Sequence, residues 1–448
     1  MSDDTSTNAA RLMPEVIERL EALVRIPSVA FPGFDAEPVH RMGEAVVDLF
    51  TAAGATDVRL LQVPDGYPCV YADLPGPEGS PTVLLYAHYD VQPPLDDSAW
   101  RTPPFELTEV DGRWYGRGTA DCKGNILAHL LALRALEDGV PVNLKLVVEG
   151  SEEQGTGGLE EFVAAHPDLL RADTILVCDT GNAAVGRPAA TVTLRGMVNV
   201  VVTVEALASE IHSGMFGGAA PDALAALISM LASLRDGRGN TVVTGLDNSQ
   251  TWSGEEYPPE QFRTDAALLE GVTLLGDGTV SDMIWARPAL TILGIDCPPV
   301  TGSTAAISPR AAARLNLRIP PGVAPADAHA ALVDHLFAAA PWGVHVNIDT
   351  EAVGSPFQAS TTGPAFEAMG AAMFEAYGVP MATLGQGGSI PLCNVFAQTY
   401  PRAELILMGV EEPLALIHAP NESVDPSEIQ AMAHTLALFL QLYAEAHQ

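Results

Sequence analysis

Two hydrophobic patterns alternate along the first half of the chain. Runs of strand length that are rich in apolar residues predict strands at 58–63, 69–74, 83–89, 144–148 and 175–178, and the last three of these are typical of strands buried on both faces. Apolar residues at helical spacing predict helices at 14–24, 39–53 and 125–136. The turn pair Asp111-Gly112 predicts a hairpin over 105–115. Strands that alternate with helices predict an α/β domain with a mixed, largely parallel sheet flanked by helices.

The pattern changes after Gly181. A long β-branched segment at 191–204 predicts a strand, and further helices and strands are predicted at 223–234, 290–295, 311–319, 326–340 and 344–349. This succession predicts an inserted α+β sandwich, because the earlier alternation returns at 364–377, 405–408 and 426–446. We therefore assign 1–186 and 353–448 to the α/β domain and 187–352 to the insertion. Residues 1–8 are expected to form a mobile tail.

The chain is strongly acidic. Its 448 residues contain 56 Asp and Glu against 22 Lys and Arg, which gives a formal net charge of -34. Such a surface repels phosphate backbones and anionic membranes, so we expect no nucleic acid partner. No run of about 18 apolar residues occurs, and no membrane span is therefore expected.

The cysteines and the first residues bear on the cellular compartment. The five cysteines are scattered and include no Cys-x-x-Cys pair, which argues against a disulfide framework or a thiolate zinc site. The first ten residues are polar and acidic, unlike a signal peptide. Both observations favour a cytoplasmic protein.

Polar residues stand where the predicted strands end. His88 and Asp90 close the 83–89 run, and as residues i and i+2 they point to the same side of an extended chain. Taken alone, this pair is as compatible with ordinary strand-end polarity as with a site. Further candidates follow other strands or precede a helix: Asp121, Glu152, Glu153, Asp179 and His418. In an open α/β sheet, such positions meet at one edge.

Carboxylates gathered at one edge need positive charge. Without it they repel one another, and their burial costs several kcal/mol. A divalent metal ion removes this cost. Two imidazoles and three carboxylates suit zinc, with manganese or cobalt as substitutes. Two ions bridged by one carboxylate, about 3.5–4 Å apart, form a known hydrolytic arrangement.

The chain resembles the metallopeptidase family of aminoacylases, glutamate carboxypeptidases, succinyl-diaminopimelate desuccinylases and carnosinases. The matching motifs are His88-Tyr-Asp90, Gly118-Thr-Ala-Asp121, Glu152-Glu153 and His418-Ala-Pro-Asn-Glu422. The longer stretches His88–Pro93 and His212–Gly218 are most similar to the carnosinase-like dipeptidase branch. The likeness runs in order from about Glu15 to the last predicted helix. Cys122 departs from the residues that the family more often has there, which leaves the ligand assignment untouched.

The resemblance implies two divalent metal ions per subunit. Asp121 would bridge both ions. His88 and Asp179 would complete one site, and Glu153 and His418 would complete the other. Because dipeptidases of this family have Asp where related deacylases often have Glu, Asp179 favours the dipeptidase branch.

The resemblance also implies the catalytic roles. The ions would lower the pKa of a shared water, and Glu152 would take its proton as general base. The water oxygen would then attack the amide carbonyl, and Glu152 would return a proton to the leaving amine. Asp90 would orient His88, and the Asp121–Cys122 peptide bond would be cis.

Three residues outside the metal motifs are expected to contact the substrate. His212, in the insertion, resembles the histidine that reaches into the partner subunit's active site, which implies a homodimer formed through the inserted lid or dimerisation domain. Arg318 resembles the residue that binds the substrate's free carboxylate, a task that suits the guanidinium fork. Ser389, in a Gly-Gly-Ser loop, is expected to contact the same carboxylate.

These observations predict hydrolysis of the amide bond of dipeptides or short peptides with a free C-terminal carboxylate. An N-acyl-amino-acid deacylase or carboxypeptidase of the same family is the first alternative. A non-catalytic metal-binding protein is the second, although such a protein would have no need of Glu152.

Overall fold

The apolar runs of the first half form the centre of a large mixed sheet. This computed structural model describes residues 2–137 and 139–447, and nine strands pair in this sheet within that part of the chain. The main path is β1 (Asp57–Leu61), β2 (Cys69–Leu74), β6 (Asn143–Glu149), β3 (Thr82–His88), β7 (Thr174–Cys178), β17 (Glu404–Met408), β8 (Ala189–Leu194) and β15 (Phe357–Gln358), with β16 (Ala382–Gln386) also paired to β8. The four central strands, β6, β3, β7 and β17, run parallel. The predicted α/β class with a mixed sheet is therefore confirmed.

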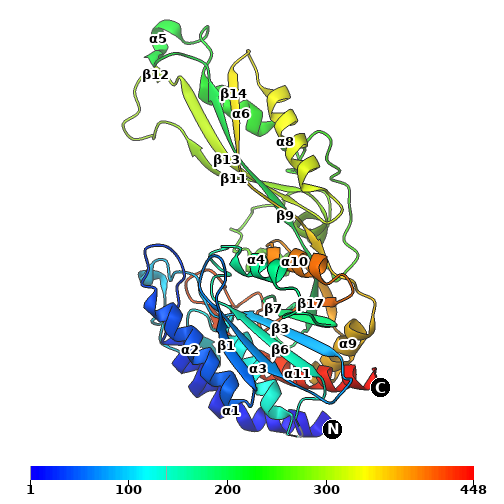
Figure 1. Cartoon of the computed structure of the whole chain (residues 1–448). Coiled ribbons are helices and arrows are strands. Elements are labelled where there is room, and N and C mark those ends of the chain that lie inside the picture. Colours follow the sequence, from blue (N-terminus) through cyan, green and yellow to red (C-terminus); the bar gives the residue numbers. More distant parts are fainter. Residues whose placement is uncertain (1, 138, 448) are drawn as a thin grey trace. The chain divides into compact units, whose positions relative to one another are not determined.

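Helices cover both faces of this sheet (Figure 1). One face and its core belong to α1 (Ser2–Val24), α2 (Glu37–Ala52), α3 (Lys123–Ala135), α9 (Pro364–Tyr377) and α11 (Pro426–Glu445). Two helices that pack on each other, α4 (Gly158–Ala165) and α10 (Pro391–Thr399), lie on the other face. Strand β3 shows why both faces are covered. Val83 and Leu85 belong to the core that the sheet shares with α1, whereas Leu84 and Tyr86 point to the opposite face and are equally buried.

Two local predictions are wrong. Residues 2–8 are part of α1, which reaches back to Ser2 and packs on α3; the amide of Asn8 donates to the carbonyl of Ala135, and Met1 is outside the described residues. The 191–204 segment is two strands, β8 and β9 (Gly196–Glu205), which join different sheets and are separated at Arg195. Apolar and polar residues keep alternating through Arg195, so the sequence pattern did not reveal the break.

The chain divides into two compact units. Unit 1 comprises 1–192, 359–384 and 391–448, and unit 2 comprises 193–358 and 385–390. Unit 2 thus starts and ends a few residues later than the proposed insertion, and it also takes in the Gly387–Ser389 loop. In unit 1 the predicted hairpin forms β4 (Thr108–Val110) and β5 (Arg113–Tyr115), and β5 pairs with β18 (Ser423–Val424). None of the described helices is long and apolar enough to cross a bilayer.

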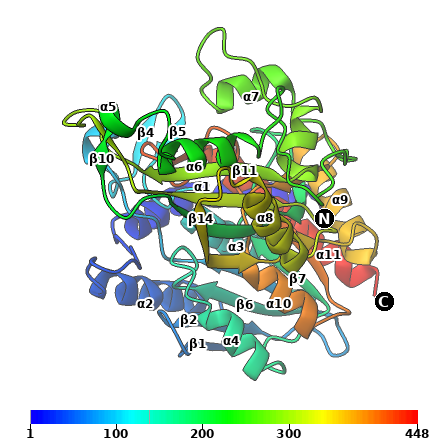
Figure 2. The same ribbon diagram turned by 90° about the horizontal axis from the view of Figure 1, so that it is seen from above.

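Unit 2 is built on a four-stranded antiparallel sheet. Its order is β11 (Ala289–Asp296), β13 (Arg310–Ile319), β9 and β14 (His345–Gly354). Two helices, α6 (Ala223–Ala232) and α8 (Pro325–Ala339), pack on one face, as Figures 1 and 2 show. The smaller elements include β10 (Ile211–His212), α5 (Ser213–Phe216), α7 (Pro259–Asp265), a π-helix at Asp282–Ala286 and β12 (Ala306–Ile307). Alternate residues of β9 and β13, such as Val198 and Leu317, form the core under the helices, so their neighbours Met197 and Arg318 lie on the opposite face.

Candidate metal centre

The parallel strands of unit 1 deliver acidic and imidazole side chains to one edge of the sheet. His88 is the last residue of β3 and pairs with Glu149, the last residue of β6. Asp179 directly follows β7, and Glu411 comes three residues after β17. Because these four strands are parallel, their carboxyl ends lie at the same edge, which is where sites form in open α/β sheets.

Asp121 lies between the two predicted histidine ligands. Its Oδ1 is 2.8 Å from Nε2 of His88, and its Oδ2 is 3.0 Å from Nε2 of His418. Nε2 of His88 is also 3.0 Å from Oδ1 of Asp179, and Nε2 of His418 is 3.1 Å from Oε2 of Glu153. The five predicted metal ligands therefore lie together. One oxygen of Asp121 faces His88 and Asp179, and the other faces His418 and Glu153. The Asp121–Cys122 peptide bond is cis.

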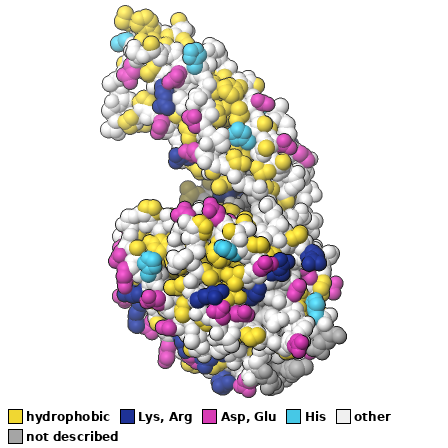
Figure 3. Space-filling model, in the orientation of Figure 1, with side chains coloured by type: hydrophobic (Ala, Val, Ile, Leu, Met, Phe, Trp, Pro, Cys, Tyr) yellow, Lys and Arg dark blue, Asp and Glu magenta, His cyan; other side chains and the backbone are white. Residues whose placement is uncertain are grey.

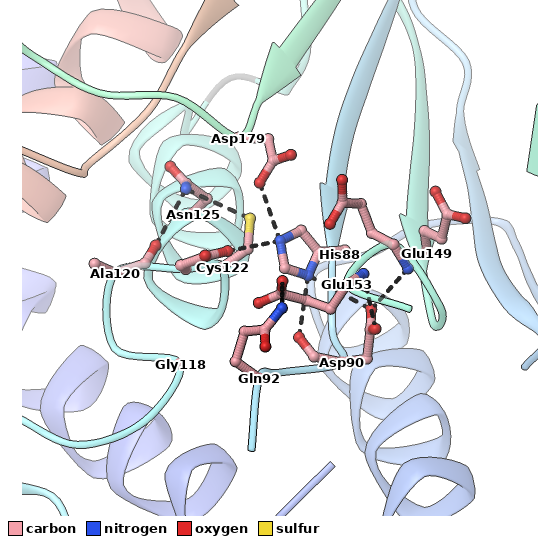
Figure 4. A network of polar contacts seen from close by, with 12 residues as sticks. His88, Asp90, Gln92, Gly118, Ala120, Cys122, Asn125, Glu149, Glu153 and Asp179 are labelled. Carbon is pink, nitrogen blue, oxygen red and sulfur yellow. Dashed lines mark hydrogen bonds and ion pairs between the residues drawn. The ribbon is translucent and has the colours of Figure 1, made fainter. Parts of the chain in front are cut away.

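The main chain fixes the tautomer of His88. Nδ1 lies 3.0 Å from the carbonyl oxygen of Asp90 (Figure 4). A carbonyl can only accept, so Nδ1 carries a proton, and Nε2 faces the oxygens of Asp121 and Asp179. Two carboxylates that converge on one nitrogen require positive charge between them, either a proton on Nε2 or a metal ion that Nε2 binds. The imidazole is completely buried and so is well placed to hold that cation.

The Asp90 carboxylate makes different contacts from those predicted. Its nearer oxygen is 3.5 Å from Nδ1 of His88, whereas its two oxygens accept hydrogen bonds from the backbone N–H groups of Glu152 and Glu153, each at 3.1 Å. Figure 4 shows Asp90 between His88 and the turn that carries Glu153. Asp90 therefore connects the end of β3 with the turn after β6: its carbonyl orients the imidazole, and its carboxylate orients the two glutamates.

The charge of the cluster is unbalanced. In the described part of the chain, no lysine or arginine forms an ion pair with Asp121, Glu152, Glu153, Asp179 or Glu411. Burial raises the pKa of Glu153 to about 7 and the pKa of Glu152 well above its usual value. Hydrogen bonds that Nε2 of His418 donates to the carboxylates of Asp121 and Glu153 raise the pKa of His418 to about 11. All three shifts favour the protonated form, which is the expected response of buried carboxylates that no lysine or arginine neutralises.

An unpartnered oxygen points to the missing charge. Oε1 of Glu153 is buried, and no described residue donates a hydrogen bond to it, although Gln92 donates to Oε2 at 2.7 Å. Asp121, Glu153 and His418 form one group whose ligand atoms could hold an ion, and Asp121, Asp179 and Glu411 form another. Imidazole nitrogens and carboxylate oxygens are the donor set of zinc, manganese and cobalt. The residues present therefore fit divalent metal ions.

Cys122 is close to the same cluster but is a poor ligand. Its thiol lies near His88 and Asp179, with which it forms a third possible ligand group, and Sγ is 3.1 Å from the carbonyl oxygen of Cys178. Burial raises the pKa of the thiol to about 12. Because only the thiolate binds metal ions well, Cys122 is not expected to compete with the oxygen ligands.

The predicted substrate contacts belong to unit 2. His212, on β10, is exposed, and its Nδ1 accepts a hydrogen bond from the backbone of Gly214 at 3.1 Å. Arg318, on β13, is half-buried, and it makes no hydrogen bond or ion pair with the described residues. Ser389 is half-buried in the loop that precedes α10. Unit 1 thus brings the predicted metal ligands together, and the three substrate residues lie in the other unit.

Sequence reasoning missed three residues of interest. Glu411 follows a short strand in the same way as Asp179, so the strand-end rule could have found it. Arg195 was hidden in a β-branched run, although a charged residue in such a run is itself a signal. Glu422 was recognised as part of a motif but was given no role, because its partners, Arg117–Asp121, are distant in the sequence.

Comparison with known proteins finds relatives that match most of the chain. A 44% identical relative, covering 82% of this chain and 82% of its own length, is the cysteinylglycine-S-conjugate dipeptidase of Corynebacterium striatum. The Beta-Ala-His dipeptidase of Rattus norvegicus is 29% identical over 91% of this chain and 88% of its own length. Human carnosine dipeptidase 1 superposes with a TM-score of 0.82 at 25% identity, covering 99% of both chains. The model of peptidase family M20/M25/M40 matches residues 84–442, and the chain therefore belongs to this peptidase family, as its motifs predicted.

Proposed function

We propose that this peptidase hydrolyses the amide bond of dipeptides that have a free amino group and a free carboxylate. The observation that carries the proposal is the placement of Asp121, whose two oxygens face two different imidazoles, the buried one of His88 and the exposed one of His418. The names of the relatives, cysteinylglycine-S-conjugate dipeptidase and Beta-Ala-His dipeptidase, support the substrate class.

We assign the metal ligands to two groups that share Asp121. His88 and Asp179 would complete one site, and Glu153 and His418 would complete the other, with zinc as the preferred ion and manganese or cobalt as substitutes. When bound, divalent ions supply positive charge that lowers the pKa of water and stabilises a developing oxyanion. Asp90 holds both groups in place, because it contacts His88 and the Glu152–Glu153 turn.

Glu152 is our proposed general base. Its backbone is anchored on Asp90, and no described residue hydrogen bonds to its carboxylate, so the carboxylate is free to receive a proton. It would take a proton from the attacking water while the water oxygen forms a bond to the carbonyl carbon. It would then give that proton to the amine nitrogen as the amide bond breaks. A carboxylate whose pKa is raised by burial retains a proton well enough to deliver it.

Glu411 supports a substrate with a free amino group. It is buried beside Asp121 and Asp179, and these two carboxylates add to burial in raising its pKa well above the usual value. Two divalent ions bring four positive charges, whereas Asp121, Glu152, Glu153, Asp179 and Glu411 bring five negative ones. The remaining negative charge would attract the ammonium group of a dipeptide, whereas a neutral N-acyl group offers no charge to pair with it.

Two arginines of unit 2 support a substrate with a free carboxylate. Arg318 pairs with Met197 across the sheet, and Arg195 is two residues before Met197, so both arginines lie on the face opposite the helices. Nε and Nη1 of Arg195 are buried, and no described residue accepts a hydrogen bond from them. Burial, and to a lesser extent the charge of Arg318, lowers the pKa of Arg195 to about 10. Two neighbouring guanidinium groups without a carboxylate fit an anionic ligand.

We also propose that the enzyme is a homodimer formed through unit 2. Strand β11 is at the edge of its sheet, and its outer residues Ile292, Leu293 and Ile295 are exposed. Met215 and Phe216 of α5 are also exposed, and Figure 3 shows hydrophobic side chains at the end of unit 2 that carries α5. A second copy could pair along this edge and cover these side chains. His212, next to α5, would then act in the active site of the partner subunit.

A substrate panel tests the proposed function. We expect faster hydrolysis of dipeptides such as Cys-Gly and β-Ala-His than of N-acetyl or N-succinyl amino acids; the opposite order would favour the deacylase alternative. Glu152→Gln should lower kcat by about 10²–10⁴-fold while the protein still binds two metal ions. A variant that keeps its turnover would contradict the general-base assignment.

Mixing inactive subunits tests the dimer. If His212 acts across the interface, His212→Ala subunits mixed with Glu152→Gln subunits should recover part of the activity. No recovery in a mixture that sedimentation shows to be dimeric would contradict the role of His212. A Leu293→Asp variant should sediment as a monomer if β11 forms the interface.

A further inference from the structure

The carboxylate of Glu422 binds the loop that carries Asp121 through four polar contacts. Its Oε2 lies 2.7 Å from Nη1 of Arg117 and accepts from the backbone N–H of Gly118 at 2.9 Å. Its Oε1 accepts from the backbone N–H groups of Ala120 and Asp121, each at 3.1 Å. The carboxylate is fully buried, and Arg117 is almost fully buried. A buried charge with four donors fixes the loop strongly, because losing any donor leaves the charge under-compensated.

The segment that carries Glu422 also carries His418, in a backbone that needs support. His418 and Asn421 have positive φ angles of 61° and 70°, in the left-handed region that residues other than glycine rarely adopt. Such a conformation is unfavourable for a residue with a side chain and persists only where the surroundings impose it. Asn421 is held by the 99–101 segment through the carbonyl of Ala99 and the N–H of Arg101. On the C-terminal side of Asn421, Glu422 anchors the same segment to the backbone of the Asp121 loop.

We propose that Glu422 is a positioning residue that sets the distance between Asp121 and His418 and so controls the ion that these two residues share. The proposal rests on the metal sites of the proposed function. One carboxylate is bonded to the backbone N–H of Asp121 and lies four residues after His418, so it joins a loop before α3 to a loop before α11. His88 depends less on this connection: its Nε2 also contacts Asp121, but the carbonyl of Asp90 fixes its ring at the end of β3.

Metal binding to stripped protein gives a direct test. The protein is freed of metal with a chelator and titrated with zinc in competition with a chromophoric chelator. Wild type should bind two ions. Glu422→Gln, which removes the charge and places an amide among backbone donors, should weaken the ion held by His418 by about 10- to 100-fold. The ion held by His88 and Asp179 should weaken less.

A double-mutant cycle separates positioning from general loosening of the fold. In a His418→Ala background, Glu422→Gln should cost clearly less zinc affinity than in wild type, because part of its effect passes through His418. In a His88→Ala background it should keep its full effect on the remaining ion. Full additivity in the His418→Ala background would overturn the proposal.

The chain offers a matched control. Arg113 forms a second ion pair with the same C-terminal segment, through Glu412, and also donates to Ser423, but it contacts neither Asp121 nor His418. Arg113→Gln should lower the melting temperature and leave both zinc affinities unchanged. If Glu422→Gln does not fold, Glu422→Asp keeps the charge but cannot reach all four donors, and it should show the same selective loss. Unchanged zinc affinity in a folded Glu422 variant contradicts the inference, whereas a wild type that binds no divalent ion contradicts the proposed function.

Discussion

The main-chain carbonyl of Asp90, and not its carboxylate, is the atom of that residue nearest to Nδ1 of His88. The carbonyl oxygen is 3.0 Å away and the carboxylate oxygen 3.5 Å away. The carboxylate is thereby free to accept from the backbone of Glu152 and Glu153. The two functions of Asp90 are carried by different atoms, and a substitution can separate them.

Asp90→Asn tests this separation. The asparagine keeps the carbonyl that orients His88, but it has only one side-chain oxygen to accept from two N–H groups. The Glu152–Glu153 turn should loosen, and kcat should fall by about 10- to 100-fold with little change in KM or in the affinity of the ion bound to His88. Steady-state kinetics and zinc titration measure the three quantities. If the ion bound to His88 is lost instead, the carboxylate is what orients the imidazole.

Glu411→Gln tests the proposed recognition of the amino group. The substitution removes one negative charge and keeps the shape of the side chain. KM for a dipeptide should rise by about tenfold or more, because a hydrogen bond between charged groups is lost. Hydrolysis of an N-acetyl amino acid should not suffer, since that substrate has no ammonium group. Glu412→Gln is the matched control, because the neighbouring Glu412 is paired with Arg113. If the hydrolysis of both substrates suffers equally, Glu411 does not recognise the amino group.

Arg195→Gln tests the proposed carboxylate site. For a dipeptide, KM should rise by about 10- to 100-fold, whereas the C-terminal amide of the same dipeptide should be affected much less. The loop after Gln386 passes close to this guanidinium: a Cβ on Gly387 would lie 2.8 Å from Nη2. Titration of metal-free protein with the dipeptide and its amide reads binding without turnover. The assignment would be contradicted if Arg195→Gln and Arg318→Gln both still bound the free dipeptide more tightly than its amide, to the same degree as wild type.

The sequence pattern located those site residues that stand at the ends of buried strands. A buried strand makes a long apolar run, and a residue at its end can only reach the sheet edge, so His88 and Asp179 could be located from the pattern alone. Arg195 could not be placed in this way, because apolar and polar residues alternate across the point where the chain leaves one sheet for another. The role of Glu422 depends on contacts between loops about 300 residues apart, and no local pattern encodes such contacts.

His129 gives a prediction about stability that is independent of the metal centre. It lies on α3 inside the helical core, and both ring nitrogens are buried without a hydrogen-bond partner in the described part of the chain. Burial lowers the pKa of His129 from 6.5 to about 3. Between these pH values the unfolded state binds a proton that the folded state does not, so the free energy of unfolding should fall as the pH falls from about 6.5 towards 3.

His129→Leu should remove this effect. A leucine fills similar space and leaves no polar atom unsatisfied, so the free energy of unfolding at pH 7 should rise by about 1–2 kcal/mol. Denaturant unfolding between pH 4 and 7 should also show a shallower loss of stability in the variant than in wild type. His166→Gln, a change at an exposed histidine, should follow the wild-type curve. Parallel pH curves for wild type and His129→Leu would mean that the buried imidazole finds a partner, such as a water molecule, that satisfies it.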